Sequence, residues 1–296
     1  MAQGRELKGR IKSIEGTRKI TRSMEMVATS KLKRAQDRVV AARPYARALE
    51  AVIADLYSPE LAERFPLLRQ PERGAQGDIP RSGSRAAVLL LTSNQGLAGA
   101  FNANLIREAR GLLARLAAGG VETELHIVGR KGLGFFRYVG ATIASSRTDI
   151  GDKPTAAHGS ELIDGLMNAF IERKLDALYV VYAKYNSPLS TPPVAERVLP
   201  VTPPARKGTA RDYLLFPNAE EILTALLPLY VRNAVYRALV ETVAGEQGAR
   251  RTAMKAATDN AGEILNVLRR TYNRARQAQI TQEIAEIVGG AEALSG

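Results

Sequence analysis

The architecture of this chain is organised around residues 229–288, LYVRNAVYRALVETVAGEQGARRTAMKAATDNAGEILNVLRRTYNRARQAQITQEIAEIV. Its sixty residues contain no proline and are rich in Ala, Leu, Glu, Arg and Gln, which are good helix formers. A single helix of this length would extend ~90 Å at 1.5 Å per residue, which is more than a compact domain can enclose. The stretch therefore predicts a long helix that reaches beyond a single globular domain.

A narrow stripe of mostly small residues runs along this helix and predicts a coiled coil. The stripe recurs at steps of three and four residues, which keeps it on one side of the helix. Such a stripe lets a partner backbone come close but buries little apolar area, so the helix needs a partner. The positions are Val231, Val235, Ala238, Thr242, Gly245, Ala249, Ala253, Ala256, Asn260, Ile264, Val267, Thr271, Ala275 and Ala278.

The partner helix lies at the other end of the chain. Twelve of fifteen positions in alternating steps of four and three are apolar, and the exceptions are Arg18, Thr21 and Glu25. A heptad pattern of this length is typical of a coiled-coil helix, and Pro44 predicts a bend near Ala41. We expect the two terminal helices to pair antiparallel, with the longer C-terminal helix projecting beyond its partner. The apolar positions are Leu7, Ile11, Ile14, Ala28, Leu32, Ala35, Val39, Ala42, Ala46, Leu49, Ile53 and Leu56.

The composition limits the classes of function. The chain has 296 residues, a net charge of +12 and no Cys, so disulfides and thiolate metal sites are excluded. No run approaches the ~18 apolar residues of a membrane span and no apolar signal core is present, so we expect a protein that is soluble or held to a membrane by other proteins. Residues 1–56 hold 13 Lys/Arg against 6 Asp/Glu, whereas residues 219–296 hold 9 of each. This basic surplus implies an acidic partner surface, with a solvated charged face as the alternative.

Between the two helices the sequence predicts an α/β domain. The apolar run Ala86–Thr92 is typical of a strand covered on both faces, and strands then alternate with helical segments. This alternation predicts a mostly parallel sheet with helices on both faces. The expected strands are Ala86–Thr92, Glu124–Val128, Ala141–Ser145, Ala177–Tyr182 and Val194–Val201, and the expected helices are Asn102–Ala117, Leu133–Tyr138 and Glu161–Arg173.

The fold class is therefore α/β with a long antiparallel coiled coil, divided into six parts along the chain. We expect an N-terminal coiled-coil helix at 1–57, a linker rich in Pro, Gly, Arg and Gln at 58–84, and the α/β domain at 85–205. A connecting loop at 206–218, the C-terminal coiled-coil helix at 219–289 and a tail at 290–296 follow.

No motif in the α/β segment predicts a catalytic residue, a cofactor site or a metal site. The glycine-bearing turn Asn94–Asn102 follows the first strand, where α/β folds often bind phosphates, but it lacks the spacing of a P-loop or a dinucleotide motif. We interpret it as a tight structural turn, with a nucleotide cradle as the alternative. Three further glycines stand in the wrong order for that motif: Gly129, Gly132 and Gly134. His126 and His158 have no Cys and no paired His nearby, so we do not expect a zinc site.

Both ends of the chain resemble the gamma subunits of F-type ATP synthases. The resemblance is carried by residues 17–32 (TRKITRSMEMVATSKL) and 251–288 (RTAMKAATDNAGEILNVLRRTYNRARQAQITQEIAEIV). It continues through residues 36–45 (QDRVVAARPY), the turn Asn94–Asn102 and residues 212–217 (DYLLFP). Two features depart from the family: the segment 58–84 is longer and more basic, and Pro228 is expected to interrupt the C-terminal helix.

The resemblance implies a Rossmann-like α/β domain and a rotor shaft, a non-catalytic subunit that couples rotation of the membrane c-ring to ATP synthesis or hydrolysis in the alpha-beta ring. The implied partners are the alpha and beta subunits, the epsilon subunit and the c-ring. No cofactor and no nucleic acid are implied, and membrane contact occurs only through other subunits. The implied location is the cytoplasmic face of the bacterial inner membrane, as a peripheral part of the complex.

The resemblance also implies two sets of partner-binding residues. Those facing the alpha-beta ring are Met24, Lys31, Lys33, Arg34, Arg38, Arg250, Arg251, Arg276, Gln277, Thr281 and Glu283. The foot that meets the c-ring and the epsilon subunit includes Tyr213. Met24 is as well explained by an ordinary coiled-coil contact, and the polar residues by solvated side chains, so these alternatives stay open.

Two other classes of function are weighed against the rotor. One is a basic coiled-coil protein that binds nucleic acid, but its basic residues should then precede the apolar seam rather than alternate with it. The other is an α/β nucleotide-binding enzyme with a helical clamp, which titration of the chain with ATP and NAD tests.

Overall fold

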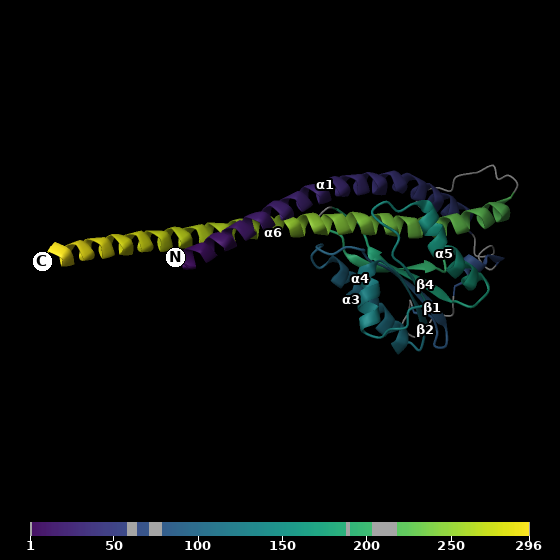
Figure 1. Ribbon diagram of the computed structural model, residues 1–296. Coiled ribbons are helices and arrows are strands. Elements are labelled where there is room, and N and C mark those ends of the chain that lie inside the picture. Colours follow the sequence, from purple (N-terminus) through teal and green to yellow (C-terminus); the bar gives the residue numbers. More distant parts are fainter. Residues whose placement is uncertain (1, 58–63, 71–78, 188–189, 203–217, 296) are drawn as a thin grey trace. The chain divides into compact units, whose positions relative to one another are not determined.

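The computed structural model describes residues 2–57, 64–70, 79–187, 190–202 and 218–295 (Figure 1). The chain divides into a sheet unit, Thr29–Ala249, and a helical unit, Met1–Ala28 with Arg250–Gly296. Two long helices contribute to both units, and all the strands belong to the sheet unit. In chain order the elements are α1 (Ala2–Leu56), η1 (Pro66–Leu68), β1 (Arg85–Leu91), α3 (Phe101–Ala118), β2 (Glu122–Val128), α4 (Arg130–Tyr138), β3 (Ser145–Arg147), α5 (Ala156–Ile171), β4 (Ala177–Ala183), β5 (Pro193–Leu199) and α6 (Ala219–Ser295).

The sheet unit contains a five-stranded sheet in the order β3-β2-β1-β4-β5. The pairs β1–β2, β1–β4 and β2–β3 are parallel, and β5 pairs antiparallel with β4 at one edge. The register places Val88 of β1 beside Leu125 of β2 on one side and Tyr179 of β4 on the other. The expected α/β class with a mostly parallel sheet is confirmed.

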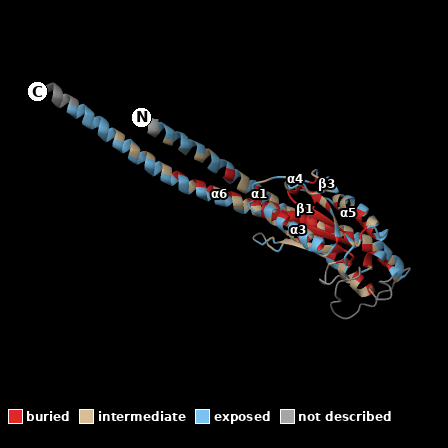
Figure 2. Ribbon diagram, turned by 90° about the horizontal axis from the view of Figure 1, so that it is seen from below, coloured by how far each residue is buried: buried red, intermediate tan, exposed pale blue. Residues whose placement is uncertain are grey.

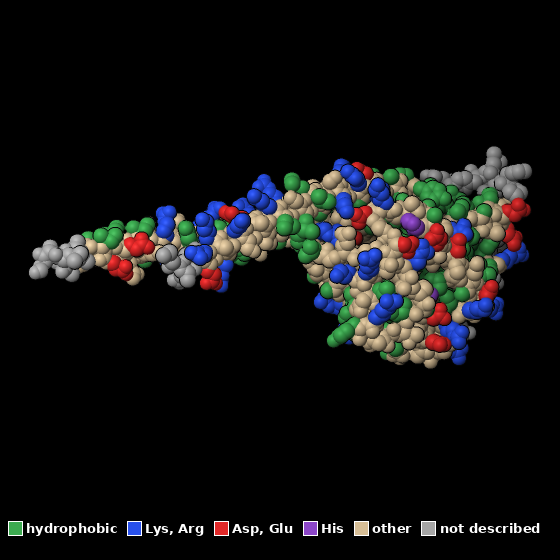
Figure 3. Space-filling model, viewed as in Figure 1, with side chains coloured by type: hydrophobic (Ala, Val, Ile, Leu, Met, Phe, Trp, Pro, Cys, Tyr) green, Lys and Arg blue, Asp and Glu red, His purple; other side chains and the backbone are tan. Residues whose placement is uncertain are grey.

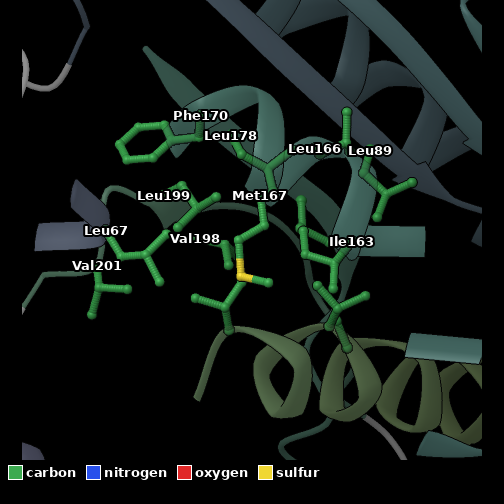
Figure 4. Close-up of a cluster of buried hydrophobic side chains, with 14 of the residues drawn as sticks. Leu67, Leu89, Ile163, Leu166, Met167, Phe170, Leu178, Val198, Leu199 and Val201 are labelled. Atoms are coloured by element: carbon green, nitrogen blue, oxygen red, sulfur yellow. The ribbon is translucent and has the colours of Figure 1, made fainter. Parts of the chain in front are cut away.

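Helices cover both faces of this sheet. Side chains alternate along β1, so Ala86, Val88 and Leu90 pack with α3 and α4, whereas Ala87, Leu89 and Leu91 pack with α5, α1 and α6. Figure 4 shows the second cluster, in which α5 side chains gather with strand residues such as Leu89 and Leu178. Burial on both faces explains why β1 reads as an unbroken apolar run.

Two expected elements in this unit differ clearly from the structure. The third strand was expected at Ala141–Ser145 but is Ser145–Arg147. Helix α5 begins at Ala156, not at Glu161, because Thr155 caps it: the Thr155 hydroxyl accepts from the N–H of His158. The imidazole of His158 accepts in return from the N–H of Thr155 at 3.2 Å. A capping box normally carries Glu or Gln at that position, so the His version escapes the usual sequence signature.

Part of the expected linker packs into the core. Phe65, Leu67 and Leu68 around η1 are buried in the same cluster as Ile53 of α1. The carbonyl of Leu67 accepts from the N–H of Val201 at 2.8 Å. This segment therefore extends the sheet unit instead of only linking it to α1. Residues 58–63 and 71–78 of the expected linker, like 203–217 of the expected loop, lie outside the described residues.

Neither internal proline ends its helix. Helix α1 is continuous through Pro44, so the bend near Ala41 stays a prediction. Helix α6 is continuous through Pro228, so the expected interruption is wrong. Proline removes the N–H that would bond the carbonyl four residues earlier, here that of Thr224, and Thr224 is exposed to solvent. Helix α6 also continues to Ser295, through most of the segment expected to be a tail.

In the helical unit α1 and α6 form an antiparallel pair (Figure 2). The earlier residue Glu15 of α1 pairs with Arg269 of α6, and the later residue Thr21 meets the earlier Thr258, so the two helices run in opposite directions. The Thr21 and Thr258 hydroxyls are 2.8 Å apart and buried, which explains why the α1 seam turns polar there. The expected α1 seam is confirmed, with Arg18 exposed as its exception.

The expected α6 seam is wrong in the helical unit. The structure buries Met254, Thr258, Ala261 and Leu265, whereas the expected positions Ala256, Asn260, Ile264 and Val267 are exposed. The buried stripe is one residue later, about 100° further round the helix. Small residues continue the upstream pattern along one side of α6, but the structure buries the larger Met254 and Leu265 on the adjacent side. Upstream, Val231, Val235, Ala238, Thr242 and Gly245 are buried as expected.

Candidate functional site

The turn after β1 is held by its own side chains. The Oδ1 atom of Asn102 accepts from the N–H of Ser93 at 3.0 Å. The Nδ2 atom of Asn94 donates to the carbonyls of Thr148 and Ile150 at 3.0 and 2.9 Å, and its Oδ1 atom accepts from the N–H of Arg130 at 3.0 Å. These polar groups bind the protein itself, which supports the interpretation as a structural turn.

Helix α6 crosses the carboxyl end of the sheet, where α/β folds place ligands. The Thr242 hydroxyl of α6 lies 3.4 Å from the N–H of Ala183, at the end of β4. A Cβ atom on Gly245 would lie 3.1 Å from both Ala183 Cβ and a Phe101 ring carbon. A cavity of about 190 Å³ remains between α6 and the end of β1, beside Ser93 and Glu246. The helix thus takes most of the space that a nucleotide would need.

The two histidines are engaged in local contacts. The Nδ1 atom of His126 is 2.7 Å from the Ser145 hydroxyl, and burial lowers the pKa of the His126 imidazole. The imidazole of His158 belongs to the cap of α5. Within the described ranges, no group of three or more His, Asp or Glu side chains could hold a metal ion.

The basic row on α1 divides between internal and exposed positions. The Lys31 ammonium donates to Oδ2 of Asp152, and the Arg38 guanidinium donates to the Asp152 carbonyl at 2.9 Å. Lys33 pairs with Asp37 one turn along the same helix, and Arg34 is exposed. Two members of the row that the resemblance assigns to a partner therefore already contact this chain.

A second polar cluster, around Arg237 of α6, gives no signal in the sequence. Its guanidinium lies 3.5, 3.7 and 3.8 Å from carboxylates of Glu50, Glu196 and Glu241. Burial raises the pKa of the Glu241 carboxyl, while the N–H of Tyr185 donates to it at 2.9 Å. The residues come from α1, β5 and α6, so only the fold brings them together.

The helical unit places the remaining N-terminal candidate at the edge of the helix pair. Met24 is half-buried and lies one turn from the buried residues Thr21 and Ala28. On α6, Arg250 is 7% exposed and Arg251 is half-buried. Arg250 was expected to face a partner, but in this structure most of its surface is covered by the chain itself. Met24 and Arg251 keep part of their surface available to a partner.

The C-terminal candidates are exposed together on one long stretch of α6. Arg276, Gln277, Thr281 and Glu283 are all exposed. Glu283 accepts from Gln279 at 3.0 Å, and the Thr281 hydroxyl donates to the Gln277 carbonyl at 2.9 Å. The side chains of Arg276 and Gln277 have no hydrogen bond or ion pair with any other residue in the described part of the chain. Tyr213 lies outside the described residues.

The last part of α6 is expected to fray in the isolated chain. Residues 281–289 are all exposed, so this stretch buries too little apolar area to hold a helix on its own. Amide hydrogen exchange should be fast at 276–289 and slow in Arg85–Leu91, which is buried in the sheet. Strong protection of 276–289 in a verified monomer would contradict this expectation.

No helix in the described ranges combines the length and the apolar character needed to cross a membrane. Both long helices carry charged residues throughout, and Figure 3 shows Lys, Arg, Asp and Glu side chains spread over the visible face.

Comparison with known proteins gives the same family over nearly the whole chain. The family model described as ATP synthase matches residues 3–294. The ATP synthase gamma chain of Gemmatimonas aurantiaca is 66% identical over 299 residues, which cover 100% of both chains. The gamma chain of Moorella thermoacetica is 44% identical over 294 residues, which cover 99% of this chain and 100% of the relative.

Solved structures share the fold at lower identity. A chain of the Euglena gracilis mitochondrial ATP synthase, in the OSCP/F1/c-ring structure of rotational state 3, has a TM-score of 0.68 and 19% identity over 99% of this chain and 95% of that chain. A chain of the rotor of the same enzyme has a TM-score of 0.64 and 18% identity over 94% of this chain and 99% of that chain. From the family model and the identity to its bacterial relatives, this chain belongs to the ATP synthase gamma chain family.

Proposed function

We propose that this chain is the central rotor shaft of an F-type ATP synthase. It couples ion-driven rotation of the c-ring to ATP synthesis and hydrolysis in the alpha-beta ring, as a subunit that is itself non-catalytic. The observation that carries the proposal is the family match, which extends without interruption from residue 3 to residue 294, through the exposed end of α6.

The two long helices suit a shaft. Helix α1 has 55 residues and α6 has 77, so the pair is asymmetric and presents different side chains in different directions. A rotor needs this asymmetry, because each rotational position must favour a different state at otherwise identical catalytic sites. The surface of a rotor must also release each contact with the surrounding subunits as it turns. Exposed residues at the end of α6 allow this, because they are not buried against this chain.

The finer contacts follow from where the candidate residues lie. The alpha and beta subunits surround Met24, Arg251 and the exposed C-terminal set, and their acidic loops meet the basic residues Lys33 and Arg34. Tyr213 and its neighbours contribute to the foot that meets the epsilon subunit and the c-ring. The chain is then held at the cytoplasmic face of the bacterial membrane only through those subunits.

The family membership does not support the two alternative classes. A nucleic-acid-binding coiled coil is not supported, and Lys31 and Arg38 on the basic helix already bind Asp152 of this chain. An α/β nucleotide-binding enzyme is not supported either, because α6 crosses the carboxyl end of the sheet.

A rotation assay tests the proposed function. The chain has no Cys, and Tyr138 at the end of α4 is 90% exposed, so Tyr138→Cys offers a single attachment point for a visible probe. The labelled chain is assembled with the alpha and beta subunits of Gemmatimonas aurantiaca and fixed to a surface through beta. We expect the probe to rotate on addition of ATP, while a probe on beta stays still. A chain that does not assemble, or a complex that hydrolyses ATP with a stationary probe, would refute the proposal.

Met24→Lys is expected to weaken coupling without stopping hydrolysis. Met24 is half-buried at the edge of the helix pair, so a lysine can extend its ammonium to the surface and leave the pair folded. A cation there gains a partner carboxylate and holds one rotational state too long. The measurement is ion pumping per ATP hydrolysed in the assembled complex, with Met24→Leu as the control. Normal pumping by Met24→Lys would show that Met24 only packs.

A further inference from the structure

We propose that Asp152 is a positioning residue that fixes the sheet to the parts of both long helices that lie within the sheet unit, so that this unit moves as one rigid body. This inference rests on the proposed rotor function and deepens it. We call the group formed by Asp152, Lys31, Arg38 and Gln247 the Asp152 clasp. All four residues belong to the sheet unit, so the clasp acts within one compact body.

Three side chains from two helices converge on Asp152. From α1, Lys31 Nζ donates to Oδ2 at 2.5 Å and Arg38 Nη1 donates to the main-chain carbonyl at 2.9 Å. From α6, Gln247 Nε2 donates to Oδ1 at 3.4 Å. One loop residue thus binds both helices through its side chain and its backbone, and charge-assisted bonds of this kind are the stronger ones.

The loop that carries Asp152 is itself tied to the sheet. Asn94, at the end of β1, donates from one amide nitrogen to the carbonyls of Thr148 and Ile150. Its amide oxygen accepts from the N–H of Arg130, where α4 begins. Asn94 thus bonds the sheet to the loop at residues 148 and 150, the main chain leads from there to Asp152, and Asp152 bonds both helices.

Apolar packing alone would hold the helices less firmly. Beside the clasp, the apolar contact between α1 and α6 is made by small or branched residues, Ala35 and Val39 against Val240 and Ala244. Packed helices can slide past each other by small amounts, because apolar burial is non-directional and changes little with a small shift. Hydrogen bonds of 2.5–3.4 Å break within about an ångström of such a shift, so the clasp resists sliding in a way that the apolar contact does not.

Two features of the surroundings support this role. The cavity of about 190 Å³ beside Asp152 leaves the packing between α6 and the end of β1 incomplete at this point. Gln247 is 1% exposed, and its Oε1 atom has no hydrogen-bond partner among the described residues. A buried amide oxygen without a hydrogen bond lowers stability. The hydrogen bond from Gln247 Nε2 to Asp152 best explains why a glutamine is found at this buried position.

The test compares the torsional stiffness of rotors in the complete complex. The double variant Lys31→Met with Asp152→Asn removes the ion pair, and Asp37→Asn, which breaks the exposed Lys33–Asp37 pair on the same helix, is the matched control. A probe at Tyr138→Cys reports the angular fluctuation of the sheet unit while a non-hydrolysable nucleotide stalls the ring. We expect at least about a twofold larger angular variance in the double variant, and wild-type variance in Asp37→Asn and in Lys31→Arg, which keeps the cation.

A second measurement uses the isolated chain, so the proposal can be tested even if the double variant does not assemble with the other subunits. Spin labels at Val40→Cys on α1 and Tyr138→Cys on α4 give a distance distribution within the sheet unit, and both positions are exposed. The distribution should broaden in the double variant and stay narrow in Asp37→Asn. If the double variant leaves both the angular variance of the probe and the spin-label distance distribution unchanged, the proposed clasp is wrong. The rotor function is still supported in that case, provided that the wild-type chain rotates. Failure of the wild type to assemble or rotate would instead refute the proposed function.

Discussion

Gly129→Ala is expected to lower the free energy of unfolding by at least about 3 kcal/mol, the largest effect expected of a Gly→Ala change at the described glycines. Gly129 stands between β2 and α4 with φ at +99°, a conformation that residues with a side chain rarely adopt. An alanine Cβ would lie 2.1 Å from the carbonyl oxygen of Thr92 and 2.7 Å from its hydroxyl. Backbone strain and overlap therefore act together.

Thr92 cannot move away at low cost. Its N–H and its hydroxyl both donate to the Val128 carbonyl at 2.8 Å, and the hydroxyl accepts from the N–H of Gly132 at 3.0 Å. Relief of the overlap must break this group of bonds at the end of β1, which is buried. The change is measured by denaturant unfolding of the isolated chain, followed by circular dichroism.

Gly134→Ala, inside the helix α4 that follows Gly129, is the matched control. A Cβ atom at Gly134 meets nothing within 4 Å, so alanine should stabilise α4 by up to ~1 kcal/mol through its higher helix propensity. Opposite signs for two Gly→Ala changes five residues apart would show that close approach, and not helix propensity, requires Gly129. A loss of less than ~0.5 kcal/mol in Gly129→Ala would contradict that account.

The largest functional effect is expected at Arg276 and Gln277. Neighbouring residues on a helix point ~100° apart, so both side chains cannot be buried by one coiled-coil partner. In the structure both are exposed and bind no other described side chain. We propose that they bind groups of the alpha-beta ring in one rotational state and release them in the next, each bond contributing ~1.5–3 kcal/mol when well formed.

Arg276→Ala or Gln277→Leu should therefore slow multi-site ATP hydrolysis in the assembled complex several-fold. Turnover at a single occupied site should change less, because it needs no full rotation. The isolated chain should unfold within ~0.5 kcal/mol of wild type, since neither side chain contributes to its fold.

Gln279→Leu is the control for this pair of variants. Gln279 lies on the same exposed stretch, but its amide donates to Glu283 one turn along the helix, so it should affect hydrolysis little. An equal loss of multi-site and single-site rates, or a clear loss of stability in the isolated chain, would show that Arg276 and Gln277 serve assembly or folding instead.

The sequence predicts the long helices and their direction well because coiled-coil periodicity is a local property. Every apolar position of the predicted α1 seam, from Leu7 to Leu56, is at least half-buried, since steps of four and three residues fix one side of a helix whatever lies against it. The sequence predicts the strand β1 equally well, because an unbroken apolar run indicates a strand whose two faces are both covered by other elements. The resemblance to the gamma family in 251–288 is also carried by consecutive residues, so it predicts the rotor function without knowledge of the tertiary contacts.

The α6 seam shows where local periodicity stops. Small residues continue on more than one side of the helix after Ala249, so the sequence alone does not choose between Ile264 and Leu265 as the buried position. The structure chooses Leu265, which is 2% exposed against 47% for Ile264. The choice depends on the partner surface, here α1, and not on α6 itself.

The sequence alone predicts most of the elements, their order and the antiparallel pairing of the terminal helices. The packed fold determines which distant residues meet: Thr92 with Gly129, Asn94 with the loop at 148–150, and Asp152 with Lys31 and Gln247. The difference is one of range along the chain. Helix and strand patterns arise between residues a few positions apart, whereas Lys31 and Asp152 are separated by 121 positions, and their contact exists only after the sheet and both helices have packed together.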